Sequence, residues 1–323
     1  MIQRPRTKQW ITDCETIYDT YELSDSGKLT EQAIIGKKSD QFMSRSETIL
    51  NHFQESYPLK KDGKLLDFGC GQGHLLRSCK KLFPDMSLCG TDSGVEKKEK
   101  IELIEGVDYS SNVLNDDNQF DVITLFHVLE HLSQPELTLS TIKQIMTSDG
   151  LLLIQVPNPS RNPFDLVVYD HGLFFQAHNL NGLLLKAGFQ VLGLYDNWAA
   201  KEYTAVCRLP STSKKYSDST ALYPKVNAEC ILRRQEKYLS SVLELAIVRS
   251  LESPIAVFGT SNGASWIVEE IGISNISHFL DEDEGLWGSR IYGKNIIRPN
   301  SDNIKDAIFP IDKYTMDRIK ERY

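Results

Sequence analysis

The sequence predicts an α/β protein in which a doubly wound, open parallel sheet is followed by a smaller second α/β domain. Three observations lead to this fold class. From residue 64 onward, short apolar runs alternate with longer amphipathic stretches, which is typical of buried parallel strands covered by helices. A polar, serine-rich stretch interrupts this alternation at Leu209–Pro224. A second strand, ending in a glycine, then opens at Ile255–Gly259.

The expected boundaries follow these changes in composition. Residues 1–63 form a helical or irregular lead-in, with a helix at Ser44–Phe53 because apolar residues recur there at helical spacing. Residues 64–209 form the main domain, 210–253 a linker and a helix, and 254–323 the C-terminal domain. The strands expected in the main domain are Leu65–Phe68, Ser87–Gly90, Asp121–Phe126, Leu151–Val156, Phe189–Leu194 and Tyr203–Arg208.

Composition and charge exclude several functional classes. No stretch of the 323 residues approaches the ~20 apolar residues that cross a bilayer. The polar start at Met1–Lys8 lacks the apolar core of a signal peptide, so we expect a cytoplasmic protein without membrane insertion. The net charge of -8 and the lack of a basic stripe argue against a nucleic-acid partner. The six cysteines form no C-x-x-C pair, which argues against structural zinc.

The strongest motif is a glycine-rich loop that follows the first strand of the main domain. Gly69, Gly71 and Gly73 stand at alternate positions between an apolar strand and an amphipathic helix. Glycines there allow a tight turn and let a ligand approach the backbone. The helix that follows offers unsatisfied N–H groups at its start. We therefore expect a ligand across the carboxyl edge of this strand.

Two carboxylates indicate which ligand the loop binds. The spacing is G-x-G-x-G, not the G-x-G-x-x-G of dinucleotide binders, and Asp67 precedes it. A carboxylate beside the loop suits a cationic amino acid better than a diphosphate. Asp92 ends the second strand, 19 residues after Gly73, where an acidic residue can bind both ribose hydroxyls. The alternative is that Asp92 only caps the next helix.

These residues resemble the motifs of the class I S-adenosylmethionine-dependent methyltransferases. Leu66–Gly73 is similar to their first motif and Asp92 to their second, and the resemblance covers about residues 40–208. It implies a Rossmann-like fold, S-adenosylmethionine as cofactor and methyl transfer. It also implies that the loop lies under the methionine part, that Asp92 binds the ribose and that Asp108 or a neighbouring residue contacts the adenine. The cofactor-binding residues expected in this way are Asp67, Gly69, Cys70, Gly71, Gly73, Asp92, Asp108 and Phe126.

The string H-x-x-E-H at His127–His131 is also a zinc pattern when both histidines lie on one helix face. His127 falls at the end of an apolar strand, so we predict no metal site from this string. His131 then has two interpretations. It is either a polar group that faces the mouth of the substrate pocket or a histidine bonded to nearby backbone.

A second group of polar residues follows the strand Leu151–Val156. Tyr169, Asp170 and His171 are consecutive in an expected loop and are suited to general-base catalysis, whereas the phenylalanines after them are equally typical of a core. This region resembles the sugar C-methyltransferases that act on nucleotide-bound deoxysugars, which carry a Tyr-His-Glu-His string. This chain has only Tyr169-Asp170-His171 at that place, so one histidine and the glutamate of the string are missing. Carbon and oxygen methylation therefore both stay open, because methylation of a hydroxyl needs only one base.

The C-terminal domain repeats the strand–glycine–helix pattern at Ile255–Gly263, and a strand that ends at Asp281 follows. It resembles the C-terminal, half-Rossmann domain of the same sugar methyltransferases. It either supports a nucleotide-sugar substrate or merely packs or forms a homodimer. A nicotinamide-dependent oxidoreductase is disfavoured because Gly259 and Gly263 have G-x-x-x-G spacing instead of the phosphate-binding pattern.

The sequence thus predicts S-adenosylmethionine-dependent methyl transfer to a saccharide, either a nucleotide sugar or a surface polysaccharide. The expected catalytic residues are His171, Tyr169 and His131, which assist removal of the acceptor proton. Two alternatives stay open: methylation of a non-sugar small molecule, and a non-catalytic protein that senses nucleotides.

Overall fold

The computed structural model describes residues 2–20, 33–35, 42–93, 95–113, 119–210, 223 and 225–323. The chain divides into two compact units. The first comprises Met1–Asn158 and Asp170–Lys225, and the second comprises Pro159–Tyr169 and Val226–Tyr323. The expected boundaries differ from this division in two places. Residues 159–169 interrupt the first unit and group with the second, and the helix after the linker also belongs to the second.

The first unit is built on one sheet with the strand order β10-β11-β8-β7-β4-β5-β6. The strands from β8 to β6 run parallel, and the α/β fold class is confirmed. β11 differs from the all-parallel expectation because it is antiparallel to both β8 and β10. The connection between β10 and β11 is too short for a crossover helix, so an antiparallel pair results. The strands are β4 (Lys64–Phe68), β5 (Ser87–Thr91), β6 (Val107–Tyr109), β7 (Phe120–Phe126), β8 (Met146–Pro157), β10 (Gln190–Tyr195) and β11 (Glu202–Arg208).

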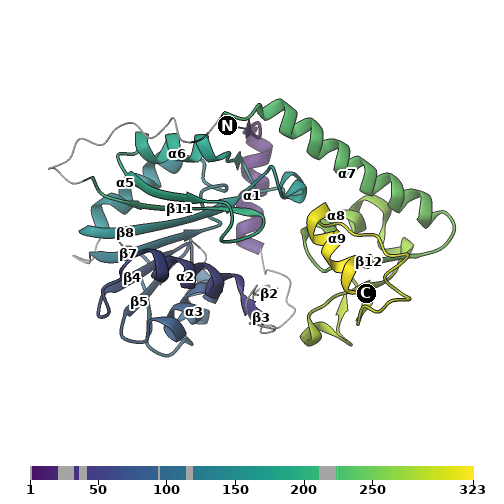
Figure 1. The fold of residues 1–323 in the computed structure, drawn as a ribbon, viewed down its shortest axis with the longest axis horizontal. Coiled ribbons are helices and arrows are strands. Elements are labelled where there is room, and N and C mark those ends of the chain that lie inside the picture. Colours follow the sequence, from purple (N-terminus) through teal and green to yellow (C-terminus); the bar gives the residue numbers. More distant parts are fainter. Residues whose placement is uncertain are drawn as a thin grey trace. The chain divides into compact units, whose positions relative to one another are not determined.

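Helices cover both faces of this sheet. In Figure 1, α5 (Pro135–Ile145) and α6 (Ala177–Lys186) lie above it, and α2 (Arg45–Ser56) and α3 (His74–Leu82) lie below it. α4 (Val95–Glu102) completes the lower layer. Each layer has its own buried core against the sheet. All six predicted strands are present. The central strands are largely buried, as continuous apolar runs predict, whereas the edge strand β10 is half-buried.

The lead-in contributes elements that support the sheet. The helix expected at Ser44–Phe53 is α2, whose capping box joins Ser44 and Glu47. β1 (Ile2–Gln3) pairs antiparallel with β9 (Leu173–Phe174), and α1 (Lys8–Thr20) follows β1 in the chain. β2 (Ala33–Ile35) and β3 (Phe42–Ser44) form a second antiparallel pair.

The second unit has a smaller sheet with the order β12-β13-β15-β14. β12 and β13 are parallel and are joined by a helix, so the predicted strand–helix–strand unit is present. Its segment Pro159–Tyr169 is fixed by Gln235, whose Nε2 donates to the carbonyl oxygen of Pro159 at 2.7 Å. The Phe164 ring lies 5.9 Å from that of Trp266. The elements are η1 (Pro163–Val167), α7 (Ala228–Ser250), β12 (Ile255–Phe258), α8 (Asn262–Ile271), η3 (Ile273–Asn275), β13 (Ile276–Leu280), η4 (Glu284–Leu286), β14 (Arg290–Ile291), β15 (Lys294–Ile297) and α9 (Lys313–Arg322).

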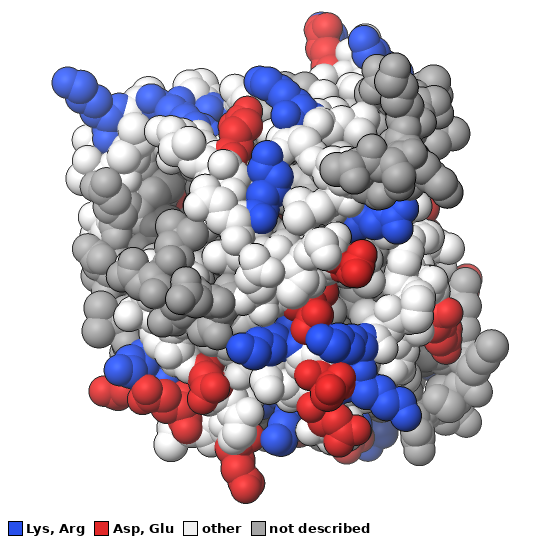
Figure 2. Space-filling view, turned by 90° about the vertical axis from the view of Figure 1, so that its left-hand side faces the viewer, with Lys and Arg blue, Asp and Glu red and all other residues white. Residues whose placement is uncertain are grey.

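The surface agrees with the mixed charge of the sequence. On the face drawn in Figure 2, lysine and arginine side chains are interspersed with aspartate and glutamate. That face therefore carries no continuous basic stripe of the kind that tracks a nucleic-acid backbone. Within the described part of the chain, every helix is too short or too polar to cross a bilayer.

Candidate functional site

The glycine loop between β4 and α3 is held against the end of β5. The N–H groups of Gly69 and Cys70 both donate to the carbonyl oxygen of Thr91, at 2.8 and 3.0 Å. Gly71 has a φ of 51°, in the left-handed region where a side chain is strained. Apart from its chain neighbours, no described atom lies within 4 Å of the position a Cβ would take at Gly71. The backbone there is open to a ligand.

Asp92 lies directly against this loop. Its Oδ2 accepts a hydrogen bond from the N–H of Gly71 at 2.8 Å. Its own carbonyl oxygen accepts from the Tyr109 hydroxyl at 2.9 Å. The acid predicted to bind ribose and the loop predicted to bind the methionine part are thus neighbours at one edge of the sheet.

The other expected cofactor residues surround this pair to different degrees. Asp67 is buried and its Oδ1 accepts from the Thr124 hydroxyl at 2.7 Å. Burial, together with the charges of Asp67 and Asp92, raises the pKa of the Cys70 thiol, which keeps the thiol neutral. The remaining three positions are Gly73 at the start of α3, Phe126 half-buried at the end of β7, and Asp108 exposed on β6.

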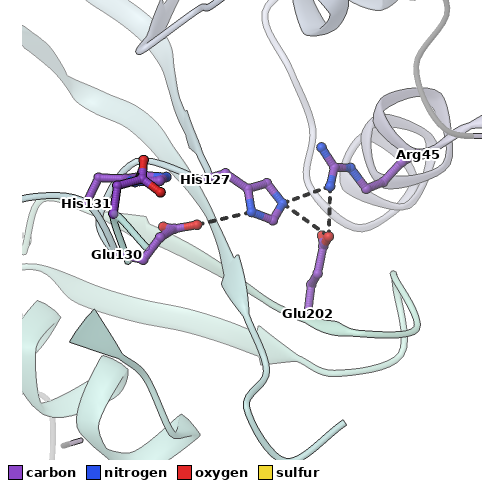
Figure 3. Close-up of polar contacts among 6 residues, drawn as sticks. Arg45, His127, Glu130, His131 and Glu202 are labelled. Atoms are coloured by element: carbon purple, nitrogen blue, oxygen red, sulfur yellow. Dashed lines mark hydrogen bonds and ion pairs between the residues drawn. The ribbon is translucent and has the colours of Figure 1, made fainter. Parts of the chain in front are cut away.

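A polar network, which we call the His127 network, lies where β7 ends. His127 has a φ of 55°, and its ring bridges two carboxylates. Nδ1 is 3.1 Å from Glu130 Oε1 and Nε2 is 3.1 Å from Glu202 Oε1. Arg45 Nη1 lies 2.9 Å from both Glu202 Oε1 and His127 Nε2. Figure 3 shows Arg45 and Glu202 on one side of the His127 ring and Glu130 on the other.

Charge determines the protonation of this network. Burial alone would lower the pKa of His127, but Glu202 and Glu130 raise it to about 9 against the opposing charge of Arg45. Burial would raise the pKa of Glu202, but Arg45 and His127 lower it to about 2. The pKa of Glu130 is also lowered, because His127, His131 and His171 outweigh its burial. The two carboxylates therefore favour the protonated form of His127, and Arg45 opposes it.

His131 and His171 adjoin the network on the Glu130 side. His131 Nδ1 is 3.0 Å from Asp170 Oδ2, and the His131 and His171 rings meet edge to face with centroids 4.6 Å apart. Burial lowers the pKa of His131, but the hydrogen bond to Asp170 and the charge of Glu130 give a net rise. An imidazole oriented by a carboxylate is the arrangement that general bases use.

The predicted run Tyr169–His171 is divided by the structure. Asp170 and His171 belong to the first unit and adjoin His131. Tyr169 groups with the second unit and its side chain is 44% exposed. A catalytic role for Tyr169 stays a prediction.

The sequence did not single out Arg45 or Glu202, and it considered His127 and Glu130 only as parts of the H-x-x-E-H string. Each stands in a different local context: a helix start, a strand end, a turn and the start of an antiparallel strand. Glu202 opens β11 opposite Pro157, where β8 ends. Because β11 is antiparallel to β8, the start of β11 lies at the edge of the sheet where the parallel strands end. Glu202 could therefore have been identified only from the strand order and direction.

The second unit has a comparable strand–glycine–helix entry. Asp281 follows β13, and its Oδ2 accepts from the Thr260 hydroxyl at 2.9 Å. Its Oδ1 accepts from the N–H of Asp283 at 3.0 Å. Burial raises the pKa of Asp281 in spite of these bonds.

Comparison with known proteins supplies the family context. Residues 44–194 match the family model described as "Methyltransferase domain". The malonyl-[acyl-carrier protein] O-methyltransferase of Halalkalibacterium halodurans is 25% identical, over 48% of this chain and 68% of that protein. A ubiquinone biosynthesis O-methyltransferase of Glaesserella parasuis is 28% identical, over 32% of this chain and 50% of that protein.

Solved structures of methyltransferases also align with part of this chain. An S-adenosylmethionine-dependent methyltransferase from Clostridium acetobutylicum aligns over 52% of this chain and 92% of its own, with 12% identity and a TM-score of 0.44. The family match lies in the first unit except for the segment Pro159–Tyr169.

Proposed function

We propose that the chain methylates a hydroxyl oxygen of a saccharide with S-adenosylmethionine as methyl donor, and the match of residues 44–194 to a methyltransferase domain supports the methyl transfer. The observation that carries the oxygen assignment is the pair His131–Asp170 beside His171. The acceptor binds over the ends of β7 and β8, next to this pair.

The cofactor binds across the ends of β4 and β5. Support comes from Gly71, whose backbone is open, and from Asp92, whose carboxylate can turn from the Gly71 N–H to the ribose hydroxyls. Asp67, buried beneath the loop with its bond to Thr124, holds the strand end in place. Bound S-adenosylmethionine supplies a methyl group already activated by its sulfonium sulfur.

The chain itself contributes alignment and removal of the hydroxyl proton. Holding the acceptor oxygen in line with the methyl carbon accounts for most of the acceleration, several kcal/mol in well-oriented reactions. A positioned base adds about 10²–10⁴-fold. His131 is the base best supported, because Asp170 orients its ring and raises its pKa. Turnover should therefore rise as pH rises through the His131 pKa.

The nature of the acceptor has two sources of support. The sequence around Tyr169–His171 and the C-terminal unit resemble sugar methyltransferases, which favours a saccharide, as a nucleotide sugar or a surface polysaccharide. The names of the similar proteins favour a non-sugar acceptor instead, since they methylate malonyl-[acyl-carrier protein] or act in ubiquinone biosynthesis. The two named relatives are O-methyltransferases, whereas the resemblance to sugar methyltransferases leaves carbon and oxygen both open.

One assay separates these possibilities. The chain is incubated with S-adenosylmethionine and either nucleotide sugars, oligosaccharides, a catechol or an acyl thioester, and S-adenosylhomocysteine is measured by mass spectrometry. We expect product with a sugar acceptor. Product with the catechol or the thioester alone would show that the acceptor is not a sugar. Cofactor binding without any product would favour the nucleotide-sensing alternative.

A variant pair tests the base. His131→Gln should lower turnover about 10²–10⁴-fold while the affinity for S-adenosylmethionine stays unchanged. His178→Gln, at the start of α6 and outside the cluster, is the matched control and should leave turnover unaltered. Equal turnover in the two variants would remove His131 from the reaction.

A further inference from the structure

Three side chains with metal-binding atoms converge beside the His127 network. Glu130, His131 and His171 each offer one nitrogen or oxygen, and these atoms all lie within 4.8 Å of one another. Glu130 is fully buried and His171 is 8% exposed. Two imidazoles and one carboxylate are a ligand set that zinc and related divalent ions favour.

The backbone fixes the two segments that carry these side chains. Glu130 and His131 follow β7, whereas His171 precedes β9. The N–H groups of Gly172 and Leu173 both donate to the carbonyl oxygen of Glu130, at 2.9 and 3.1 Å. The N–H of His131 donates to the carbonyl oxygen of Val128 at 3.1 Å. The convergence is therefore built into the chain path and is not a chance meeting of long side chains.

Glu130 provides an independent observation. Its Oε1 is bonded to His127, whereas its Oε2 is buried and has no hydrogen-bond partner among the described residues. A buried polar atom without a partner is costly and usually indicates a missing ligand, ion or water.

From these observations we propose that Glu130, His131 and His171 bind one divalent cation of the zinc class. Bonds of about 2.0–2.2 Å to the metal would draw the three ligand atoms closer together. The surrounding contacts suit this role, since metal-bound histidines and carboxylates are commonly held by further hydrogen bonds. Asp170 orients His131, and His127 orients Glu130.

Such a site differs from the H-x-x-E-H zinc pattern in the sequence. That pattern would pair His127 with His131, but His127 turns away to Glu202 and Arg45. His171, distant in the sequence, takes the second histidine position. Three protein ligands leave a position for another oxygen, as in catalytic zinc sites. A His131 ring that binds the cation cannot also accept the hydroxyl proton, so in the loaded protein the cation would replace His131 as the group that lowers the pKa of the acceptor hydroxyl. This role rests on the proposed function, but cation binding does not.

Direct metal binding tests the proposal. Tag-free protein is stripped with a chelator and titrated with ZnCl₂ by calorimetry, and with CoCl₂ by visible absorption. We expect about one zinc per chain and the cobalt bands typical of low-coordinate sites. His171→Ala should abolish binding, and Asp170→Asn should weaken it about 10–100-fold. His178→Ala is the matched control and should bind zinc like the unaltered chain.

S-adenosylmethionine titration of each variant shows whether the fold and the cofactor site are intact. Lack of zinc binding by intact protein, or full binding in His171→Ala, would overturn the proposal. Zinc binding that depends on His171 upholds the site even if every acceptor fails. If protein stripped of metal by a chelator methylated its acceptor at the full rate, the cation would not take part in catalysis. The proposed effect of the cation on the pKa of the acceptor hydroxyl would then be wrong.

Discussion

The two units contain the same local pattern with different outcomes. In each, a strand leads through glycines to a helix, and the next strand ends in an aspartate. In the first unit, Asp92 bonds to the backbone of a loop whose middle residue, Gly71, is bare. In the second unit, Ser261 stands at the middle position of the loop. The Asp281 carboxylate accepts hydrogen bonds from the Thr260 hydroxyl and from the N–H of Asp283. The pattern therefore predicts a ligand site only where the chain leaves the backbone accessible.

The largest expected effect tests the two aspartates. Asp92→Ala removes the charged acceptor for two ribose hydroxyls, each worth about 1.5–3 kcal/mol. The affinity for S-adenosylmethionine should fall about 10²–10⁴-fold by calorimetry. Asp281→Ala is the control and should leave that affinity unchanged. If both variants lost affinity equally, the distinction between the units would fail.

The next effect concerns packing at the start of α8. A Cβ at Gly263 would lie 2.0 Å from the carbonyl oxygen of Pro310, so Gly263→Ala should destabilise the second unit by about 3 kcal/mol. Denaturant unfolding measures this change. Gly182→Ala lies in α6, where no described atom other than the helix's own nearby residues comes within 4 Å of the new Cβ, and it should not destabilise the chain. If Gly263→Ala left the free energy of unfolding unchanged, the start of α8 would have room for a Cβ at this position.

A smaller effect is expected at the open loop. Gly71→Ala adds a methyl group where the ligand approaches and strains a φ of 51°, which costs about 1–2 kcal/mol. We expect roughly tenfold weaker binding of S-adenosylmethionine. Ser261→Ala, at the corresponding position of the second unit, should leave this affinity unaltered. Unchanged binding by Gly71→Ala would place the cofactor elsewhere.

The smallest effect is a pH dependence in the second unit. Burial raises the folded-state pKa of Asp281 above its model-peptide value of 3.8. Burial of the charged Asp281 carboxylate therefore lowers the free energy of unfolding at pH values above the raised pKa. This destabilisation disappears as pH falls through 3.8, because the carboxyl group is then protonated in both the folded and the unfolded state. Asp281→Asn should stabilise the chain at neutral pH by less than about 1 kcal/mol. Denaturant unfolding at pH 7 and pH 3.5 checks this, and a gain of the same size at both pH values would contradict it.

Contiguous features were predictable from the sequence. Strand β4, its glycine loop and α3 form one local pattern, and Asp92 follows at a fixed spacing, so their proximity could be inferred. The direction of β11 could not, because an apolar run looks the same in parallel and antiparallel strands.

The polar clusters depend on tertiary structure. Arg45 and Glu202 are 157 residues apart in the sequence, and no local pattern connects them. His171 reaches Glu130 through backbone bonds between a turn and a loop. Periodicity describes which face a residue occupies, but it does not say which distant segments share an edge of the sheet.

The segment Pro159–Tyr169 limits how the molecule can be dissected. The chain passes between the units after Asn158, after Tyr169 and after Lys225, so no single cut releases a self-contained catalytic fragment. A truncation at residue 225 would strip the Phe164 ring of Tyr238 and Trp266 and leave the Pro159 carbonyl without Gln235. A soluble catalytic fragment therefore requires a redesigned connection from Asn158 to Asp170, the residue that orients His131.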